Sequence, residues 1–204
     1  MIPVGYMAKR VQARTDWLNA VYVLDIYSVS NCISENLYNH IWEKLDLIRK
    51  LNRIWKLNRI WPPHLIWNPN EYWLFNSPET IEELSRMYSI GPEGWTLFYY
   101  EAYEKEFDEE KREWLPFYPE QSFSTDVVVP KNKYLEGYDV VSFSSGTFPE
   151  CSPLSCNRMS ETIPVNNHCL LSSFEEGKKH LENGLFDGIH CEAGPYRIFA
   201  VYSV

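Results

Sequence analysis

The last stretch of the chain constrains the fold most. After Gly194-Pro195, residues 196–204 read Tyr-Arg-Ile-Phe-Ala-Val-Tyr-Ser-Val, a nearly continuous apolar run rich in β-branched and aromatic side chains. These side chains favour a strand, and a strand without apolar–polar alternation is typically buried on both faces. The sequence therefore predicts that the C-terminal segment is a central strand of a sheet.

The other predicted elements do not alternate regularly between strand and helix. Apolar and aromatic runs predict strands over residues 2–11, 21–29, 72–75, 95–107, 113–118, 127–129 and 138–143. Helical periodicity or a capping serine predicts helices over residues 34–50, 77–90 and 173–184. Strands and helices in this order are typical of an α+β fold, with a mainly antiparallel sheet of about six or seven strands and about three helices packed on it.

The length of 204 residues fits a single globular domain over residues 1–204. Such a chain buries enough surface to need no disulfide or metal for stability. One segment departs from the rest: the hexapeptide Lys-Leu-Asn-Arg-Ile-Trp fills residues 50–55 and again 56–61, before Pro62-Pro63. Two copies are too few for a solenoid. Residues 50–70 are therefore expected to form a repeat and Pro/Trp-rich insertion or loop.

Charge is distributed unevenly along the chain. The formal net charge of -9 argues against a protein that coats nucleic acid or an anionic membrane. Residues 37–61 nevertheless carry six basic against two acidic side chains, and residues 101–113 carry seven acidic against three basic ones. Another protein is the expected partner and no membrane is expected, while nucleic acid stays open for the basic segment 37–61.

Aromatic side chains gather in these two charged parts of the chain. Tyr99, Tyr103 and Trp114 lie in or beside the acidic segment, and Trp55 and Trp61 lie in the basic one. Aromatic residues are enriched at the centres of protein interfaces. The first hypothesis is therefore a small binding or interaction protein with an aromatic, acidic surface. The competing interpretation places the rings of the acidic segment on the core side of a hairpin and packs the apolar stripe of the basic segment, as a helix, on the sheet, with the charges of both in solvent.

Five cysteines make an odd set: Cys32, Cys151, Cys156, Cys169 and Cys191. The N-terminal residues lack the basic, apolar and small-residue regions of a signal peptide. Reduced thiols in the cytoplasm fit this pattern better than a disulfide framework. A soluble, cytoplasmic protein is expected.

A second hypothesis makes the chain a cysteine-dependent hydrolase or transferase. Cys156 would be the nucleophile and His168 its base, with Cys151 and Asn157 as further candidates, because a cysteine attacks only as its thiolate. The sequence contains no phosphate-binding loop, no Gly-x-Ser-x-Gly and no His-Glu-x-x-His. The residue types alone do not favour an enzyme over a binding protein.

A third hypothesis is a domain stabilised by zinc. The candidate ligands are Cys151, Cys156, Cys169 and His190, since thiolates and imidazoles are the donors that tetrahedral Zn²⁺ prefers. The spacing of the cysteines and histidines in this part of the chain is a poor match to a zinc site. His168 and Cys169 are adjacent, and adjacent residues on a strand face opposite sides, so they would not readily bind one ion together. Free cysteines often serve only as small apolar core residues. No cofactor is therefore expected first, with zinc as the alternative.

Overall fold

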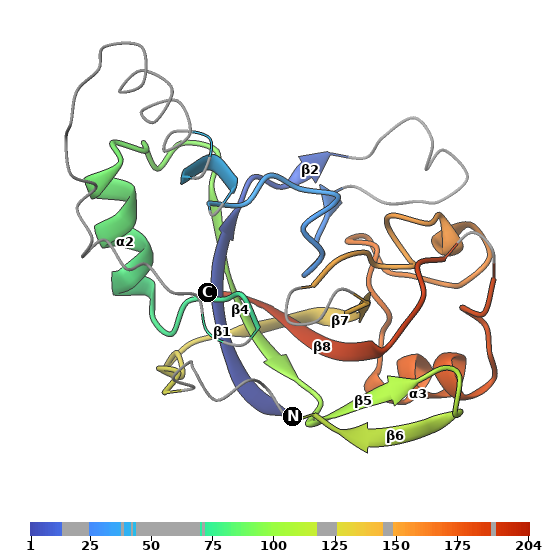
Figure 1. The fold of residues 1–204 in the computed structure, drawn as a ribbon. Coiled ribbons are helices and arrows are strands. Elements are labelled where there is room, and N and C mark those ends of the chain that lie inside the picture. The colour runs from blue at the N-terminus through green and yellow to red at the C-terminus, as the bar shows by residue number, and fades with distance from the viewer. Residues whose placement is uncertain are drawn as a thin grey trace, which may run out of the picture.

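A mainly antiparallel sheet forms the centre of the protein in a computed structural model (Figure 1). The structure describes residues 1–13, 25–37, 39–41, 43, 70, 72–117, 126–144, 149–188 and 191–204. The hexapeptide repeat and the rest of segment 50–69 lie outside these ranges, so the predicted insertion is not addressed. None of the helices within them is long and apolar enough to cross a bilayer.

The described elements confirm the predicted α+β class. The strands are β1 (Ile2–Lys9), β2 (Gln12–Ala13), β3 (Asp25–Ile26), β4 (Thr96–Ala102), β5 (Lys105–Asp108), β6 (Glu113–Pro116), β7 (Tyr134–Ser142) and β8 (Tyr196–Ser203). The helices are α2 (Pro78–Met87), α3 (Phe174–Glu182) and the 3₁₀ helix η2 (Met159–Glu161). Residues 37, 39–41 and 43 are also helical, within the helix predicted from residue 34.

The C-terminal strand β8 is central, as its apolar run predicts. It pairs with β7 along one edge and with β4 along the other, where β5 continues beyond the end of β4. Strand β1 lies outside β4, and β6 lies outside β5. The side chains of Ile198, Phe199, Ala200 and Val201 are completely inaccessible to solvent. Both faces of this strand are therefore covered.

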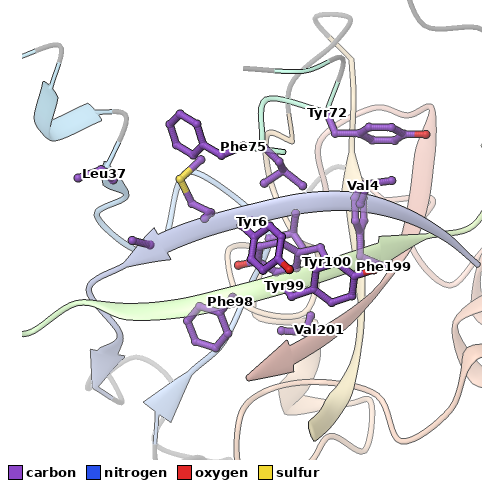
Figure 2. Packing of buried hydrophobic residues seen from close by; sticks show 14 of the residues in the cluster. Val4, Tyr6, Leu37, Tyr72, Phe75, Phe98, Tyr99, Tyr100, Phe199 and Val201 are labelled. Carbon is purple, nitrogen blue, oxygen red and sulfur yellow. The ribbon is translucent and has the colours of Figure 1, made fainter. Parts of the chain in front are cut away.

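Aromatic residues of β1 and β4 build much of the larger core cluster (Figure 2). Tyr6 and Tyr99 are register partners whose ring centroids lie 5.0 Å apart. Phe98 and Tyr100 flank this pair in the sequence and are buried as well. Cross-strand aromatic pairs of this kind stabilise a sheet beyond the area they bury. Many of the aromatics that raise the composition thus form the interior.

Strands β1, β4, β8 and β7 lie in this order and form the four-stranded core of the sheet. Its two outer strands, β1 and β7, are built alike. The ladder between β1 and β4 shifts register at Gly5, and the ladder between β7 and β8 shifts at Gly137. Both glycines have positive φ values, +131° and +150°. Immediately after each glycine, a tyrosine forms an antiparallel bridge with a distant turn. Each outer strand is thus bent at a glycine and joined to a turn at the same place.

An asparagine organises each of these turns. The Oδ1 atoms of Asn70 and Asn166 accept hydrogen bonds from the backbone N–H groups two and four residues later. Their Nδ2 groups donate to the carbonyls of Val4 and Glu136, the residues just before the two bend glycines. The residue three positions after each asparagine has a positive φ, 57° and 61°. The same side chain therefore closes a turn and ties it to the sheet in both halves.

The helices that follow the turns repeat the pattern further. Ser77 caps α2 and Ser173 caps α3, each accepting a backbone N–H three residues later at 3.3 Å. Both helices are followed by a residue of positive φ and lead to the central strands β4 and β8. Tyr100 pairs with Val201 where these strands meet. The units β1–α2–β4 and β7–α3–β8 are thus related by a local twofold axis at this pair.

The strands predicted over residues 72–75 and 127–129 are not strands. Residues 72–75 instead belong to the Asn70 turn, with Trp73 in the left-handed region. Val128 and Val129 are more than half exposed, at 53% and 52%, so their β-branched side chains have no sheet face to cover. Of the strand predicted over residues 21–29, the described part forms only β3.

The repeated bends predict matched effects of alanine. In Gly5→Ala the new Cβ would lie 2.6 Å from the Phe75 carbonyl oxygen, and in Gly137→Ala it would lie 2.8 Å from that of Leu171. Backbone strain and overpacking together should lower the free energy of unfolding by about 2–4 kcal/mol in each variant. Urea denaturation measures the loss. Gly91→Ala, where no atom lies within 4 Å of the added Cβ, is the control, and an equal loss there would contradict the interpretation.

Candidate functional site

Three of the five cysteines converge in space. The Sγ atoms of Cys32, Cys151 and Cys156 all lie within 4.8 Å of one another, and those of Cys32 and Cys151 are 3.0 Å apart. We call these three residues the thiol cluster. The sequence singles out Cys151 and Cys156, but Cys32 lies 119 positions from Cys151 and joins them only through the fold.

The loop that carries Cys151 and Cys156 is held against the end of β7. The backbone N–H of Ser142 donates to the carbonyl of Cys151 at 2.9 Å, and the Ser142 hydroxyl accepts from the N–H of Cys151 at 3.2 Å. One turn further on, the N–H of Cys156 donates to the carbonyl of Ser152 at 2.8 Å. This helical turn brings the Cys156 thiol back beside Cys151.

A buried lysine holds the other loop, which carries Cys32. The Lys9 Nζ donates hydrogen bonds to the three carbonyls of residues 28–30 at 2.6, 2.9 and 2.7 Å. Lys9 is only 2% exposed, and burial lowers its pKa to about 7, although the charge of Asp139 opposes that shift. The last strand residue of β1 thus fixes the backbone just before Cys32.

A buried aspartate connects both loops. The Asp139 carboxylate, 1% exposed, accepts from the Ser28 hydroxyl at 2.7 Å, the Val29 N–H at 3.0 Å and the Ser152 hydroxyl at 2.6 Å. Burial raises the pKa of Asp139, and these hydrogen bonds and Lys9 act in the opposite direction. One carboxylate on β7 therefore positions the segments before Cys32 and after Cys151.

Ser30 links this buried network to the thiols. Its hydroxyl donates to the carbonyl of Glu150 and lies 3.3 Å from the Cys156 Sγ. The backbone N–H of Cys32 donates to the same hydroxyl oxygen at 3.1 Å. A single side chain thus contacts the neighbourhood of all three cysteines.

The three thiols differ in acidity. A hydrogen bond from the Cys156 thiol lowers the pKa of Cys32, which is exposed. The same bond and burial raise the pKa of Cys156 far above its usual range, and burial raises the pKa of Cys151 to about 11. Cys32 is therefore the first of the cluster to ionise.

A pocket of about 530 Å³ opens beside the thiol cluster. It is lined by Asn31, Cys32, Asn39, Trp73, Glu150, Cys151 and Glu192. The Oε1 atom of Glu192 lies 3.8 Å from the Cys151 Sγ. We call this cavity the thiol pocket. It combines two carboxylates, two amides, an indole ring and two thiols.

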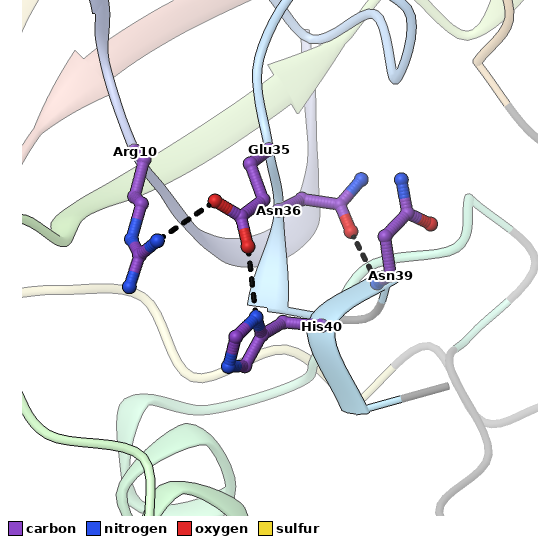
Figure 3. Close-up of polar contacts among 5 residues, drawn as sticks. All are labelled: Arg10, Glu35, Asn36, Asn39 and His40. Atoms are coloured by element: carbon purple, nitrogen blue, oxygen red, sulfur yellow. Dashed lines mark hydrogen bonds and ion pairs between the residues drawn. The ribbon is translucent and has the colours of Figure 1, made fainter. Parts of the chain in front are cut away.

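The rim of the thiol pocket is fastened to β1 by the polar contacts in Figure 3. The carboxylate of Glu35 lies between two basic side chains, 3.0 Å from the guanidinium of Arg10 and 2.8 Å from the Nδ1 of His40. The backbone N–H of Arg10 also donates to the Glu35 carbonyl at 2.8 Å. Residues 35–40 are therefore anchored to the end of the outer strand.

Asn36 bridges two of the residues that line the pocket. Its Oδ1 accepts from the backbone N–H of Asn39 at 2.8 Å, and its Nδ2 donates to the Oδ1 of Asn31 at 2.6 Å. Asn36 is completely buried, so this bridge is sheltered from solvent. It fixes the side chain of Asn31 relative to the backbone of Asn39.

Cys156 and His168, the predicted nucleophile and base, contact different residues. The His168 ring stacks on Tyr27 with centroids 4.0 Å apart, and its Nε2 lies 3.8 Å from the Glu136 carboxylate. The Cys156 thiol instead contacts Ser30 and the other members of the thiol cluster. Asn157 has a buried Oδ1 without a hydrogen-bond partner among the described residues. The nucleophile–base pair stays a prediction for which this geometry offers no support.

The other predicted zinc ligands lie elsewhere. Cys169 is buried in the smaller core cluster, among apolar side chains that include Leu154 and Ile163, and burial raises its pKa to about 12. His190 lies outside the described residues, and Cys191 is half-buried beside the same cluster. Among the predicted ligands that the structure describes, Cys151 and Cys156 are brought together and Cys169 is not.

The predicted interaction residues that the structure describes are buried or half-buried. Tyr99 has no exposed surface and belongs to the core. Tyr103 and Trp114 are half-buried and form a T-shaped pair whose ring centroids lie 5.3 Å apart. The indole N–H of Trp114 donates a hydrogen bond to the carboxylate of Glu182, the last residue of α3. Trp55 and Trp61 lie outside the described residues.

Sequence reasoning missed Lys9, Asp139, Glu192 and Cys32 as site residues. For Lys9 and Asp139 a signal was present, because each is a charged residue next to an apolar run of its strand, and charges are almost never fully buried without partners. Glu192 and Cys32 lie in loops, where no periodicity distinguishes them from surface residues.

The acidity order predicts the order of thiol alkylation. With iodoacetamide at neutral pH, Cys32 should react first, because it is exposed and its pKa is lowered. Cys169 and Cys156 should react slowest, because their pKa values are raised. Mass spectrometry of peptides from timed samples measures each site. Labelling of Cys169 before Cys32 would contradict the described geometry.

The buried lysine predicts a loss of stability and a pH effect. Lys9→Met should lower the free energy of unfolding by about 3–5 kcal/mol, because Asp139 and three carbonyls lose a buried partner. The folded-state pKa of Lys9 is about 7 and its ordinary value is 10.5, so the unfolded chain binds more protons between these values. Wild-type stability should therefore gain from rising pH between about 7 and 9, and the gap to Lys9→Met should widen.

Urea titrations at several pH values measure both effects. Lys131→Met, at an exposed position, is the matched control and should change little. A Lys9→Met variant as stable as wild type would contradict the role assigned to the buried network.

The chain was compared with protein families, curated proteins and solved structures. No family model, no curated protein and no solved structure matches it. The comparisons therefore add no functional assignment to the geometry. What the protein does has to be inferred from the thiol pocket, its charges and its thiols.

Proposed function

We propose that this chain is a binding protein that holds a cationic side chain of a partner protein in the thiol pocket. The observation that carries the proposal is the lining of that pocket, where the carboxylates of Glu150 and Glu192 share one cavity with the indole of Trp73. Its volume of about 530 Å³ falls within the range of ordinary ligand sites.

The lining suits a guanidinium or ammonium group. Carboxylates accept strong, charge-assisted hydrogen bonds from arginine and lysine, and an indole face attracts a cation. Asn31 and Asn39 add amide groups to the lining, and Asn36 holds the side chain of Asn31 and the backbone of Asn39. None of the described lining residues is basic.

The charge of the whole chain supports the same partner class. A net charge of -9 attracts a basic protein and speeds their encounter at low salt. The proposal retains the acidic and aromatic binding surface expected from the sequence. It moves that surface from the hairpin around Tyr103 and Trp114 to the thiol pocket, because those two rings pack against the body of the protein.

The test is a titration with small amides. Nα-acetyl-arginine amide should bind reduced, metal-free protein and shift the NMR signals of the Trp73 indole and the side-chain amides of Asn31 and Asn39. The neutral isostere Nα-acetyl-citrulline amide should bind far more weakly. Added salt should weaken the arginine ligand, because its binding is electrostatic.

Two variants locate the binding. Glu150→Gln and Glu192→Gln should each weaken arginine-amide binding by roughly 10-fold or more, the value of a hydrogen bond to a charged group. Glu93→Gln, at an exposed position that does not line the thiol pocket, is the control and should bind like wild type. The function would be excluded if the citrulline ligand bound as tightly as the arginine ligand. It would also be excluded if Glu150→Gln and Glu192→Gln bound the arginine ligand as tightly as Glu93→Gln does.

A further inference from the structure

We infer that the thiol cluster is a zinc site in which Cys32, Cys151 and Cys156 bind Zn²⁺ as thiolates and Glu192 supplies a carboxylate oxygen. The inference goes beyond the proposed function. Cys156, one of the zinc ligands, does not line the thiol pocket, and zinc binding does not require that the pocket holds a cationic side chain. It also differs from the zinc site expected from the sequence, since Cys169 is absent from the ligand set and Cys32 enters it.

The distances suit a tetrahedral ion. Zinc–sulfur bonds of about 2.3 Å place thiolate sulfurs about 3.8 Å apart, and a carboxylate oxygen on the same ion lies about 3.5 Å from each sulfur. The three Sγ atoms lie within 4.8 Å of one another, with Cys32 and Cys151 at 3.0 Å. Glu192 Oε1 lies 3.8 Å from the Cys151 Sγ. The three sulfurs are thus placed for one ion, and Glu192 would turn toward Cys32 and Cys156 to complete the tetrahedron.

The donor set points to a metal more than to simple packing. Cys169 shows the packing arrangement, buried among apolar side chains of the smaller core. The thiol cluster lies instead at the edge of the thiol pocket, beside Glu192 and the Ser30 hydroxyl. A disulfide would use two sulfurs, whereas this site brings together three, with a carboxylate oxygen 3.8 Å from one of them. Thiolates select soft or borderline ions such as zinc.

Binding is an acid–base exchange without oxidation. Each of the three thiols releases its proton to solvent, and the freed sulfur lone pair forms a bond to the ion. Three thiolates and one carboxylate around Zn²⁺ carry a net charge of two negative units, with zinc unchanged in oxidation state. The Lys9 Nζ donates to the carbonyl of Ser30, two residues before Cys32, so a basic group lies beside the loop that carries this ligand.

The surrounding network holds the ligands before the ion arrives. Ser30 contacts the Cys156 thiol and accepts from the Cys32 N–H, and Asp139 ties both cysteine loops to β7 through Ser28 and Ser152. Partners of this kind commonly change metal affinity by 10- to 100-fold when they are removed. The ligands therefore lose little freedom when they bind.

Cobalt and zinc titrations test the site. Reduced full-length protein should bind one Co²⁺ per chain with a sulfur-to-cobalt charge-transfer band and tetrahedral d–d bands, and Zn²⁺ should displace it. Cys32→Ser, Cys151→Ser and Cys156→Ser should each lower the affinity by at least about 100-fold, more than loss of a supporting partner does. Cys191→Ser, which removes a thiol outside the cluster, should bind like wild type. Zn²⁺ should also raise the Tm of wild type but not of Cys156→Ser.

The outcomes separate this inference from the proposed function. Cys156→Ser should lose cobalt binding and still bind arginine amide, whereas Glu150→Gln should lose arginine amide and still bind cobalt. If buried Cys151→Ser does not fold, exposed Cys32→Ser carries the test. Absence of a charge-transfer band in the reduced protein, or its persistence in Cys156→Ser, would overturn the zinc site. A Cys32–Cys151 disulfide that forms in air, without metal uptake by the reduced protein, would overturn it as well.

Discussion

The buried carboxylate of Asp139 is the interaction on which the candidate site depends. It is a charged group within β7, and its three hydrogen bonds reach the loops that carry the thiol cluster. Lys9 approaches the same network from β1, on the other side of the four-stranded core. Because a buried charge is costly without partners, the two loops have one arrangement that satisfies it. The position of the thiols thus follows from electrostatics in the interior.

The sequence predicted the elements whose signals are local. The apolar run of β8 and the serine caps of α2 and α3 are of this kind, and each has its predicted place. Apolar segments predicted strands wrongly at two places. Val128 has no sheet face to cover, and Trp73 lies in a turn that an asparagine side chain closes. The likeness of the units β1–α2–β4 and β7–α3–β8 was not predicted, because the sequence signals that they share are few: a bend glycine, a turn asparagine and a capping serine.

The site was harder to predict than the fold, for a physical reason. Residue types suggested chemistry around Cys156 and His168, but nearness along the chain did not become nearness in space. The His168 ring packs on Tyr27, while Cys156 meets Cys32 from the other side of the sequence. Thiols brought together by long-range contacts leave no spacing pattern. The charges that Lys9 and Asp139 place in their strands were the sequence signal for where these contacts form.

The local twofold axis at Tyr100 and Val201 has a consequence for the unity of the chain. Strands β4 and β8 are inner strands only because each covers the other. A chain divided between β6 and β7 would leave two pieces, each with a long apolar edge strand that invites pairing. The pieces would complement one another, and a second copy of either would present the same edge. The symmetry that closes the sheet within one molecule is therefore also a route to exchange between molecules.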